Sequence, residues 1–144
     1  MPKVTVEEIQ AICERELPIA RAMGLSVEEL GSGTARVRLP YKSDLLRPGG
    51  TISGPATMGL ADFSIYVAVL SLIGPEEMAV TTSLTCNFLR RPVQSDLLAE
   101  ARILKLGKRL AYGEVSMYSE GEEGEGPVAH VTATYSIPPQ DGPA

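Results

Sequence analysis

Residues 52–73 read ISGPATMGLADFSIYVAVLSLI, and this stretch decides the fold. Its apolar residues cover every side of a helical wheel, which is typical of a helix that is surrounded by protein. Ser53 is a good N-cap, and Pro55 is tolerated in the first turn, where amide donors have no intrahelical partner. The stretch therefore predicts one long helix at the centre of a folded domain.

A single charged residue interrupts this apolar helix. Between Arg47 and Glu76, Asp62 is the only residue of the Asp, Glu, Lys, Arg and His set. Burying an unpaired carboxylate is costly, so such a group persists when it is paired, hydrogen-bonded or used in chemistry. We expect Asp62 to be cut off from bulk water and to be a candidate catalytic group. The alternatives are a carboxylate that faces a crevice, a cap for a neighbouring backbone group, or an ion pair with Arg47 or Arg90 at an interface.

The same helix is also long and apolar enough to cross a bilayer. A carboxylate in mid-helix is costly in lipid, and Gly54, Pro55 and Gly59 fit a soluble core helix better. We therefore expect no membrane partner. The N-terminus, MPKVTVEEIQ, has acidic residues where a secretory signal needs an apolar core, so the expected location is the cytoplasm.

The segments on either side of the long helix predict an antiparallel sheet. Apolar and polar residues alternate in several stretches, with Thr82 as the only exception in residues 79–90. Thr5 and Glu8 form a capping box at the start of a surface helix that Pro18 ends. This order favours an α+β fold over a parallel α/β sheet. The expected elements are helix 5–17, a hairpin within 25–40, loop 44–51, the long helix, strands 79–90, 97–106, 109–119 and 127–137, and a frayed tail at 138–144.

The composition is that of one folded domain over residues 1–144. Hydrophobic residues make up 44% of the chain and charged residues 22%, and the net charge is -5. This charge gives no electrostatic reason to bind nucleic acid. Cys13 and Cys86 are far apart and outside CxxC spacing, so we expect neither a disulfide framework nor a zinc site. With no GxxxxGK[ST] or GxGxxG loop either, no metal and no cofactor are expected.

The start of the long helix is a second candidate site. Gly54 permits close approach of a ligand to the backbone, and free amides aligned with the helix dipole favour a developing oxyanion. The alternative is simply a well-capped helix. Asp62 lies eight residues beyond Gly54, about 12 Å along the axis at 1.5 Å per residue. The helix of one chain therefore does not form a compact site, and a facing subunit would have to contribute.

Three motifs carry a family resemblance over residues 20–138: GGTISGPATMGLADF at 49–63, NFLRRP at 87–92 and LGKR at 106–109. Together they resemble hotdog-fold acyl-CoA thioesterases of the phenylacetate-degradation (PaaI-like) type. That family wraps a long helix in an antiparallel sheet, so the resemblance implies a hotdog fold of five to six strands, here with an extra N-terminal helix within residues 1–20. The family's helix starts with H-G-G and continues to L-A-D. Here Ser53, Gly54 and Pro55 occupy the H-G-G positions, and Leu60, Ala61 and Asp62 form the L-A-D.

The resemblance implies hydrolysis of an acyl-CoA thioester to a free acid and CoA, with CoA as part of the substrate. Asp62 would act as general base or nucleophile, and the Gly54 amide would polarise the thioester carbonyl. It also implies homodimers, paired into homotetramers, with each active site at a subunit interface. Ser53 replaces the family's histidine, and Pro55 removes an amide donor. The alternative function is therefore a non-catalytic acyl-CoA binding or sensing protein of the same fold.

Further residues are candidates for binding the substrate. Basic residues lie at the end of one expected strand and at the start of another. They favour a site that binds the phosphates of CoA. The alternative is that these residues are solvated at the strand ends. The candidates for CoA binding are Arg90, Arg91, Lys108 and Arg109, with Asn87 of the NFLRRP motif. The apolar candidates for the acyl pocket are Met58, Phe63 and Tyr66.

Other catalytic classes are disfavoured by the single histidine. His130 lies on the polar face of the last expected strand, where we expect a structural role, and no GxSxG elbow occurs. A Ser-His-Asp esterase is therefore not expected. A hydratase of the hotdog type is also disfavoured, because related hydratases pair a histidine with the aspartate.

Overall fold

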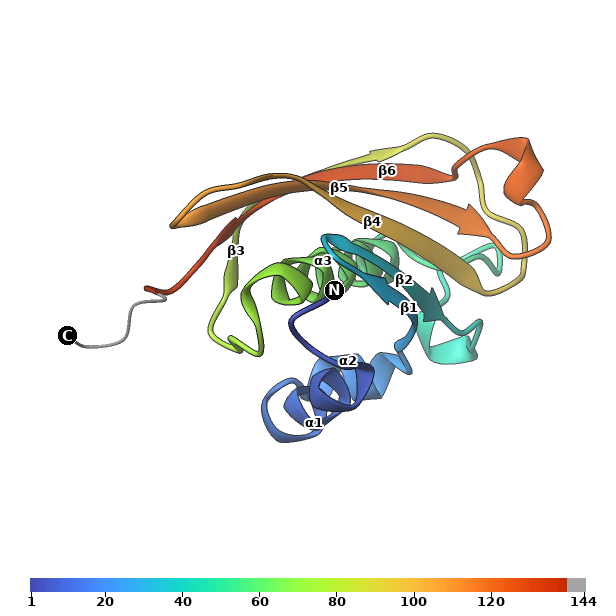
Figure 1. The fold of residues 1–144 in the computed structure, drawn as a ribbon. Helices are drawn as coiled ribbons and strands as arrows, with labels where there is room; N and C mark the ends of the chain where they lie inside the picture. Colours follow the sequence, from blue (N-terminus) through green and yellow to red (C-terminus); the bar gives the residue numbers. More distant parts are fainter. Residues whose placement is uncertain (140–144) are drawn as a thin grey trace.

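A six-stranded antiparallel sheet arches over one long helix, as Figure 1 shows for this computed structural model, which describes residues 1–139. The strand order is β1-β2-β4-β5-β6-β3, so β1 and β3 are the two edges. The helices are α1 (Val6–Glu16), α2 (Pro18–Met23) and α3 (Gly54–Ile73), with single-turn 3-10 helices η1 (Ser43–Leu45) and η2 (Glu123–Glu125). The strands are β1 (Ser26–Gly31), β2 (Thr34–Leu39), β3 (Val80–Phe88), β4 (Leu97–Leu106), β5 (Leu110–Ser119) and β6 (Ala129–Ser136). This is the hotdog architecture that the sequence predicts.

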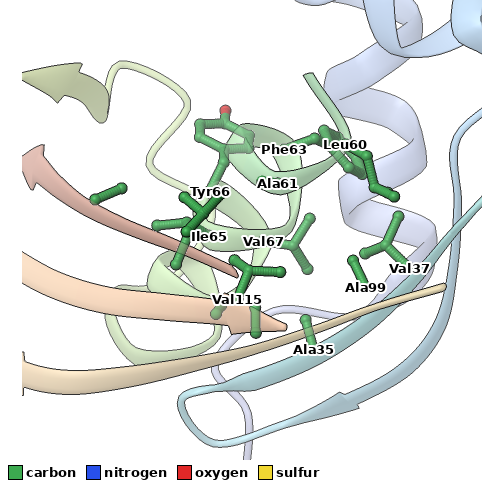
Figure 2. Close-up of a cluster of buried hydrophobic side chains, with 14 of the residues drawn as sticks. Ala35, Val37, Leu60, Ala61, Phe63, Ile65, Tyr66, Val67, Ala99 and Val115 are labelled. Atoms are coloured by element: carbon green, nitrogen blue, oxygen red, sulfur yellow. The ribbon is translucent and has the colours of Figure 1, made fainter. Parts of the chain in front are cut away.

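Helix α3 fills the concave side of the sheet. Figure 2 shows Val67 of α3 beside Val37, Ala99 and Val115, which come from β2, β4 and β5. All four side chains are fully buried, and burial stabilises each valine by about 1.5–3 kcal/mol relative to exposure. α3 is long and apolar enough to span a membrane, but 72% of its most apolar window is buried inside the protein. It is therefore the core helix of this fold.

The start of α3 follows the local sequence. The Ser53 hydroxyl accepts a hydrogen bond from the Ala56 amide at 3.3 Å, as an N-cap should. Ser53 also donates its own amide to the Leu45 carbonyl at 2.8 Å, which ties the helix start to η1. The long predicted helix is therefore confirmed.

The N-terminal segment contains two helices where the sequence predicted one. The capping box of Thr5 and Glu8 is present, and α1 ends at Glu16. Pro18 then begins α2, because a residue without an amide hydrogen is well suited to the first turn of a new helix. Figure 1 shows α1 and α2 on the side of α3 away from β5 and β6. This pair of helices forms one wall of the cavity described below.

Strand β3 departs from simple alternation at the residue where the sequence does. Thr81 pairs with Tyr135 and Ser83 pairs with Thr134, so Thr82 is the extra residue of a β-bulge. The bulge allows Thr81 to point toward α3 although it is out of phase with Leu84 and the residues that follow. The apolar face of β3 is only partly covered, because Leu84 and Cys86 are half-buried and Phe88 is 57% exposed.

The remaining strands agree with the predicted ranges to within two residues. The turn at residues 107–108 joins β4 to β5, with the Gly107 amide donating to the Leu110 carbonyl at 2.8 Å. Of the predicted tail at 138–144, residues 140–144 lie outside the described residues.

Candidate active site

The Asp62 carboxylate is held by two hydroxyl groups from neighbouring strands. Thr81 of β3 donates its hydroxyl to Asp62 Oδ1 at 2.6 Å. The Tyr135 hydroxyl of β6 lies 2.7 Å from the same oxygen and 2.9 Å from the Asp62 carbonyl oxygen. No described residue donates to Oδ2. One oxygen is therefore fixed by the protein, while the other is free to meet a ligand or a water.

Asp62 lies on the wall of a cavity of about 240 Å³, which we call the Asp62 cavity. Its walls come from α1, α2 and α3, from the start of β3 and from Tyr135. Asp62 is half-buried, so the expectation that it has no route to water is wrong. Asp62 lies where the cavity between the N-terminal helices, α3 and the start of β3 reaches the carboxylate. Asp62 has no cationic partner among the described residues of one chain. The alternative of an ion pair with Arg47 or Arg90 at an interface involves a second subunit and stays a prediction.

The two hydroxyl donors remain protonated at physiological pH. Burial raises the pKa of Tyr135 well above its ordinary value, and the neighbouring Asp62 charge raises it further. Because the phenol stays neutral, it can donate to the carboxylate at any pH that an assay would use.

The start of α3 opens into a second, larger cavity of about 620 Å³, which we call the helix-start cavity. Gly54 and Thr57 line it from α3, and Phe88 lines it from the end of β3. The Gly54 amide has no hydrogen-bond acceptor in residues 1–139. Pro55 has no amide hydrogen, and the Ala56 amide is taken by Ser53. The cavity wall therefore carries one free helical amide.

The two candidate sites lie at opposite ends of β3. Asp62 contacts Thr81 at the start of β3, whereas a side chain at Gly54 would meet Phe88 at the end of that strand, 3.4 Å away. Neither cavity is lined by both Asp62 and Gly54. The expectation that one chain leaves these groups apart is thus consistent with the geometry.

The predicted cations divide between the two ends of the sheet. Arg90 and Arg91 line the helix-start cavity, together with Arg47. Lys108 and Arg109 lie beside the far end of β6, where Arg109 donates its Nε to the Ile137 carbonyl at 3.0 Å. The length of β6 between these ends is about 23 Å at 3.3 Å per residue. One chain therefore does not gather the four cations into one cluster.

Comparisons with known proteins identify the family. The family model of the thioesterase superfamily matches residues 49–125, more than half of the chain. The chain belongs to the thioesterase superfamily. A "putative thioesterase" from Silicibacter sp. TM1040 has 42% identity and a TM-score of 0.85, and the match covers 96% of this chain and 95% of that one.

Two further members match over most of their lengths. A mutant of the phenylacetic acid degradation protein PaaI from Thermus thermophilus has 29% identity and a TM-score of 0.72, with 84% of this chain and 99% of that one covered. A "putative esterase" from Saccharolobus solfataricus is 28% identical over 81% of this chain and 77% of its own length. The predicted thioesterase family is thus confirmed, and the family indicates a hydrolase.

Other predicted residues of this thioesterase-superfamily member lie outside the two cavities. Met58 is 36% exposed and lines neither of them, nor does Asn87 on the exposed side of β3. Ser53 also lines neither cavity, because its hydroxyl caps α3. Phe63 and Tyr66 do line the Asp62 cavity, and their role as acyl-pocket residues stays a prediction.

His130 lines neither cavity of this thioesterase fold. Its Nε2 lies 2.9 Å from Glu114, which also accepts from Arg102. These two partners lower the pKa of Glu114, first the Arg102 guanidinium and then His130. No group of three His, Cys, Asp or Glu side chains within residues 1–139 could hold a metal ion.

Arg47, which lines the helix-start cavity, was considered from the sequence only as an ion-pair partner of Asp62. Thr81 and Tyr135 were not among the predicted site residues. Two features of the sequence indicated Thr81 and Tyr135. The break in alternation at Thr82 marks a bulge, and Tyr135 falls on the buried face of its strand, where a tyrosine hydroxyl needs a partner. Asp62 was the obvious acceptor in the chain.

Proposed function

We propose that this protein hydrolyses acyl-CoA thioesters to a free acid and CoA. The observation that carries the proposal is the Asp62 carboxylate on the wall of a cavity, whose Oδ1 accepts from Thr81 and Tyr135 while Oδ2 accepts from no described residue. A carboxylate that is oriented by neutral donors and open on one side is suited to act as base or nucleophile. Family membership supports thioester hydrolysis as the reaction class.

A homodimer would complete the site. β3 is an edge strand with exposed apolar residues, which in a stable protein are normally covered. Suppose that β3 pairs antiparallel with β3 of a second copy about a two-fold axis at Thr85. Paired residues must face the same side of the sheet, so Leu84 would then lie opposite Cys86 of the second copy. Because of the bulge, Thr81 would lie opposite its Phe88.

This register would bring the separated groups together. Asp62 is fixed to Thr81, and Gly54 lies beside Phe88. Asp62 of one protomer would therefore face Gly54 of the other. The same symmetry would carry Lys108 and Arg109 of one protomer toward the end where Arg90 and Arg91 of the other lie. The predicted pairing of two dimers into a tetramer stays a prediction.

The positions of the helix-start cavity and of the Gly54 amide suggest their roles in binding the thioester. The helix-start cavity, with Arg47, Arg90 and Arg91, would hold the CoA portion, because guanidinium groups bind phosphate in bidentate fashion. The thioester carbonyl would accept a hydrogen bond from the Gly54 amide, which would strengthen as the oxygen becomes negative.

The chemistry can follow two routes from the same carboxylate. As a base, Asp62 takes a proton from water while the water oxygen attacks the carbonyl, and the collapsing intermediate expels the CoA thiolate, which recovers the proton. As a nucleophile, Asp62 forms an acyl anhydride and expels the thiolate, and water then hydrolyses the anhydride. Single-turnover hydrolysis in ¹⁸O-labelled water tests for the second route, because label enters Asp62 only when water attacks the Asp62 carbonyl carbon of the anhydride.

The test of the proposal is thiol release from a panel of acyl-CoAs by the purified protein. We expect turnover in the wild type and a loss of about 10²- to 10⁴-fold in kcat in Asp62→Asn, the range by which a positioned acid or base contributes. The asparagine can still accept from Thr81 and Tyr135, so the fold should be retained. No release from any acyl-CoA, or equal turnover in the variant, would refute the assignment.

A second function, acyl-CoA binding without turnover, is favoured by one observation. The helix start offers a single free amide, because Pro55 has none and Ser53 occupies that of Ala56. If this donor is too weak, thioesters should bind tightly without hydrolysis. Calorimetric titration with the same panel separates the two functions.

A further inference from the structure

We infer that the Asp62 cavity selects uncharged, apolar acyl groups of about eight heavy atoms, and that the N-terminal helices set this limit. The inference rests on the proposed function, because it assigns the acyl portion of the thioester to the cavity at Asp62. Met23 is the residue that determines this specificity.

The wall of the cavity is mostly hydrocarbon. α1 and α2 close one side of it, and two aromatic residues of α3 form the opposite side. Leu17, Ala20 and Met23 belong to the first wall, and Phe63 and Tyr66 to the second. Ala20 and Met23 are 2% and 9% exposed, and Phe63 and Tyr66 are each 7% exposed. A linear or aryl hydrocarbon would therefore replace water against apolar surface on two sides, which is favourable.

The volume limits the length of the acyl group. The cavity measures about 240 Å³. A group the size of one water occupies roughly 30 Å³, so about eight such groups fill it. Acyl groups from hexanoyl to octanoyl, or a single aromatic ring, match this size. Longer chains would exceed this volume.

The charges at the cavity exclude a second carboxylate on the acyl group. Glu16, Glu77 and Asp62 line it, and no lysine or arginine does. Glu77 is paired with Arg15 at 2.5 Å, but that guanidinium is outside the lining. A dicarboxylic acyl group such as succinyl would meet like charges and lose its hydration, which disfavours binding.

The polar atoms of the wall offer little to a hydroxylated acyl group either. The Tyr66 hydroxyl donates to the Glu77 carbonyl at 3.1 Å, and the Tyr135 and Thr81 hydroxyls donate to Asp62. Burial raises the pKa of Tyr66 to about 12, so it remains a neutral donor that is already in use. The cavity thus has no free hydroxyl donor among these three residues.

Met23 sets the depth of the cavity by lying across α3. A Cβ atom at Gly59 would meet Met23 Cε at 3.0 Å and Sδ at 3.2 Å, so the missing side chain at Gly59 lets the methionine approach the helix. The end of this flexible side chain forms part of the wall. Met23→Ala removes three heavy atoms from that wall and should lengthen the cavity.

The experiment measures kcat/KM for straight-chain acyl-CoAs from two to twelve carbons, with succinyl-CoA beside pentanoyl-CoA. In the wild type we expect kcat/KM to rise about fourfold for each methylene added up to hexanoyl, since a buried methylene contributes about 0.8 kcal/mol. It should level off or fall beyond octanoyl, and succinyl-CoA should be at least roughly tenfold worse than pentanoyl-CoA. Met23→Ala should move the optimum about two to three carbons longer.

Met117→Ala is the matched control. Met117 is fully buried on β5 and lines neither cavity, so its loss destabilises the protein without changing the acyl pocket. The decanoyl-to-hexanoyl ratio within each variant does not depend on the folded fraction. This ratio should rise in Met23→Ala and stay at the wild-type value in Met117→Ala.

Binding of S-alkyl-CoA thioethers, which cannot be hydrolysed, makes the inference independent of turnover. Their Kd should tighten about fourfold per methylene and shift with Met23→Ala in the same way. If no thioester is hydrolysed but this trend holds, the proposed hydrolysis fails and the acyl selectivity stands. If affinity and rate do not vary with chain length, or Met23→Ala leaves the optimum unchanged, the inference is overturned while hydrolysis can stand.

Discussion

Asp62 uses its two carboxylate oxygens differently, and this difference depends on Tyr135. Oδ1 accepts from the Tyr135 and Thr81 hydroxyls, while Oδ2 accepts from no described residue and the side chain lines the cavity. Removing the Tyr135 hydroxyl in Tyr135→Phe leaves one donor and lets the carboxylate rotate. A hydrogen bond to a charged group contributes about 1.5–3 kcal/mol, so we expect kcat to fall at least about tenfold, with KM nearly unchanged.

Steady-state kinetics of Tyr135→Phe beside Tyr118→Phe check this role. Tyr118 is half-buried on β5 and lines neither cavity, so its variant should keep the wild-type kcat. A rise in KM without a fall in kcat would mean that Tyr135 only shapes the pocket. An unchanged kcat would mean that Thr81 alone orients the carboxylate.

At the residue scale, the sequence revealed Asp62 but not the groups that hold it. A lone carboxylate in an apolar helix stands out because its burial is costly. Thr81 and Tyr135 are 19 and 73 residues away along the chain, and their contact with Asp62 depends on how β3 and β6 pack on α3. Lys108 and Arg109 looked like partners of Arg90 and Arg91, but antiparallel pairing sends the two cation pairs to opposite ends of the sheet.

At the scale of elements, the contact between α3 and the sheet depends on Gly113 in β5. A Cβ atom there would lie 2.9 Å from the Arg102 carbonyl oxygen and 2.9 Å from Ile65 Cδ1 of α3. The carbonyl oxygen cannot move without disturbing the β4–β5 pairing. Gly113→Ala should therefore lower the free energy of unfolding by about 1–3 kcal/mol, as overpacking does.

Urea unfolding measures this change, with Gly124→Ala as the control. Nothing lies within 4 Å of a Cβ atom at Gly124, so that variant should be close to neutral. Equal midpoints for the two variants would show that α3 can shift on the sheet. Such freedom would also weaken the case for a rigidly placed Asp62.

The elements themselves could largely be predicted from local patterns. The capping box of α1, the Ser53 cap of α3 and the alternation in β2 and β6 each depend on residues near one another in sequence. The α1–α2 break was missed because Pro18 can end one helix or begin another, and only the packing of Ala20 and Met23 on the core decides between them.

At the scale of the whole molecule, the proposed function needs a second copy in one particular register. The two-fold axis at Thr85 would place the two Thr85 side chains directly opposite each other, at the Cβ separation of about 4.5–5.5 Å that is usual for cross-strand neighbours. Thr85→Cys should therefore form a disulfide between protomers on mild oxidation, because cross-strand neighbours come close to disulfide geometry. The product is a covalent dimer on non-reducing electrophoresis, and reductant should return it to monomer.

Thr132→Cys is the matched control for this register. Thr132 pairs with Thr85 within one chain but lies on β6, an inner strand, so the second copy does not reach it. It should give no covalent dimer under the same oxidation, and neither should the wild type with its native Cys13 and Cys86, because Cys86 would face Leu84 of the second copy. If Thr85→Cys stays monomeric while ultracentrifugation finds a dimer, the copies meet elsewhere. Asp62 then has no Gly54 to face, and the proposed hydrolysis loses its oxyanion donor.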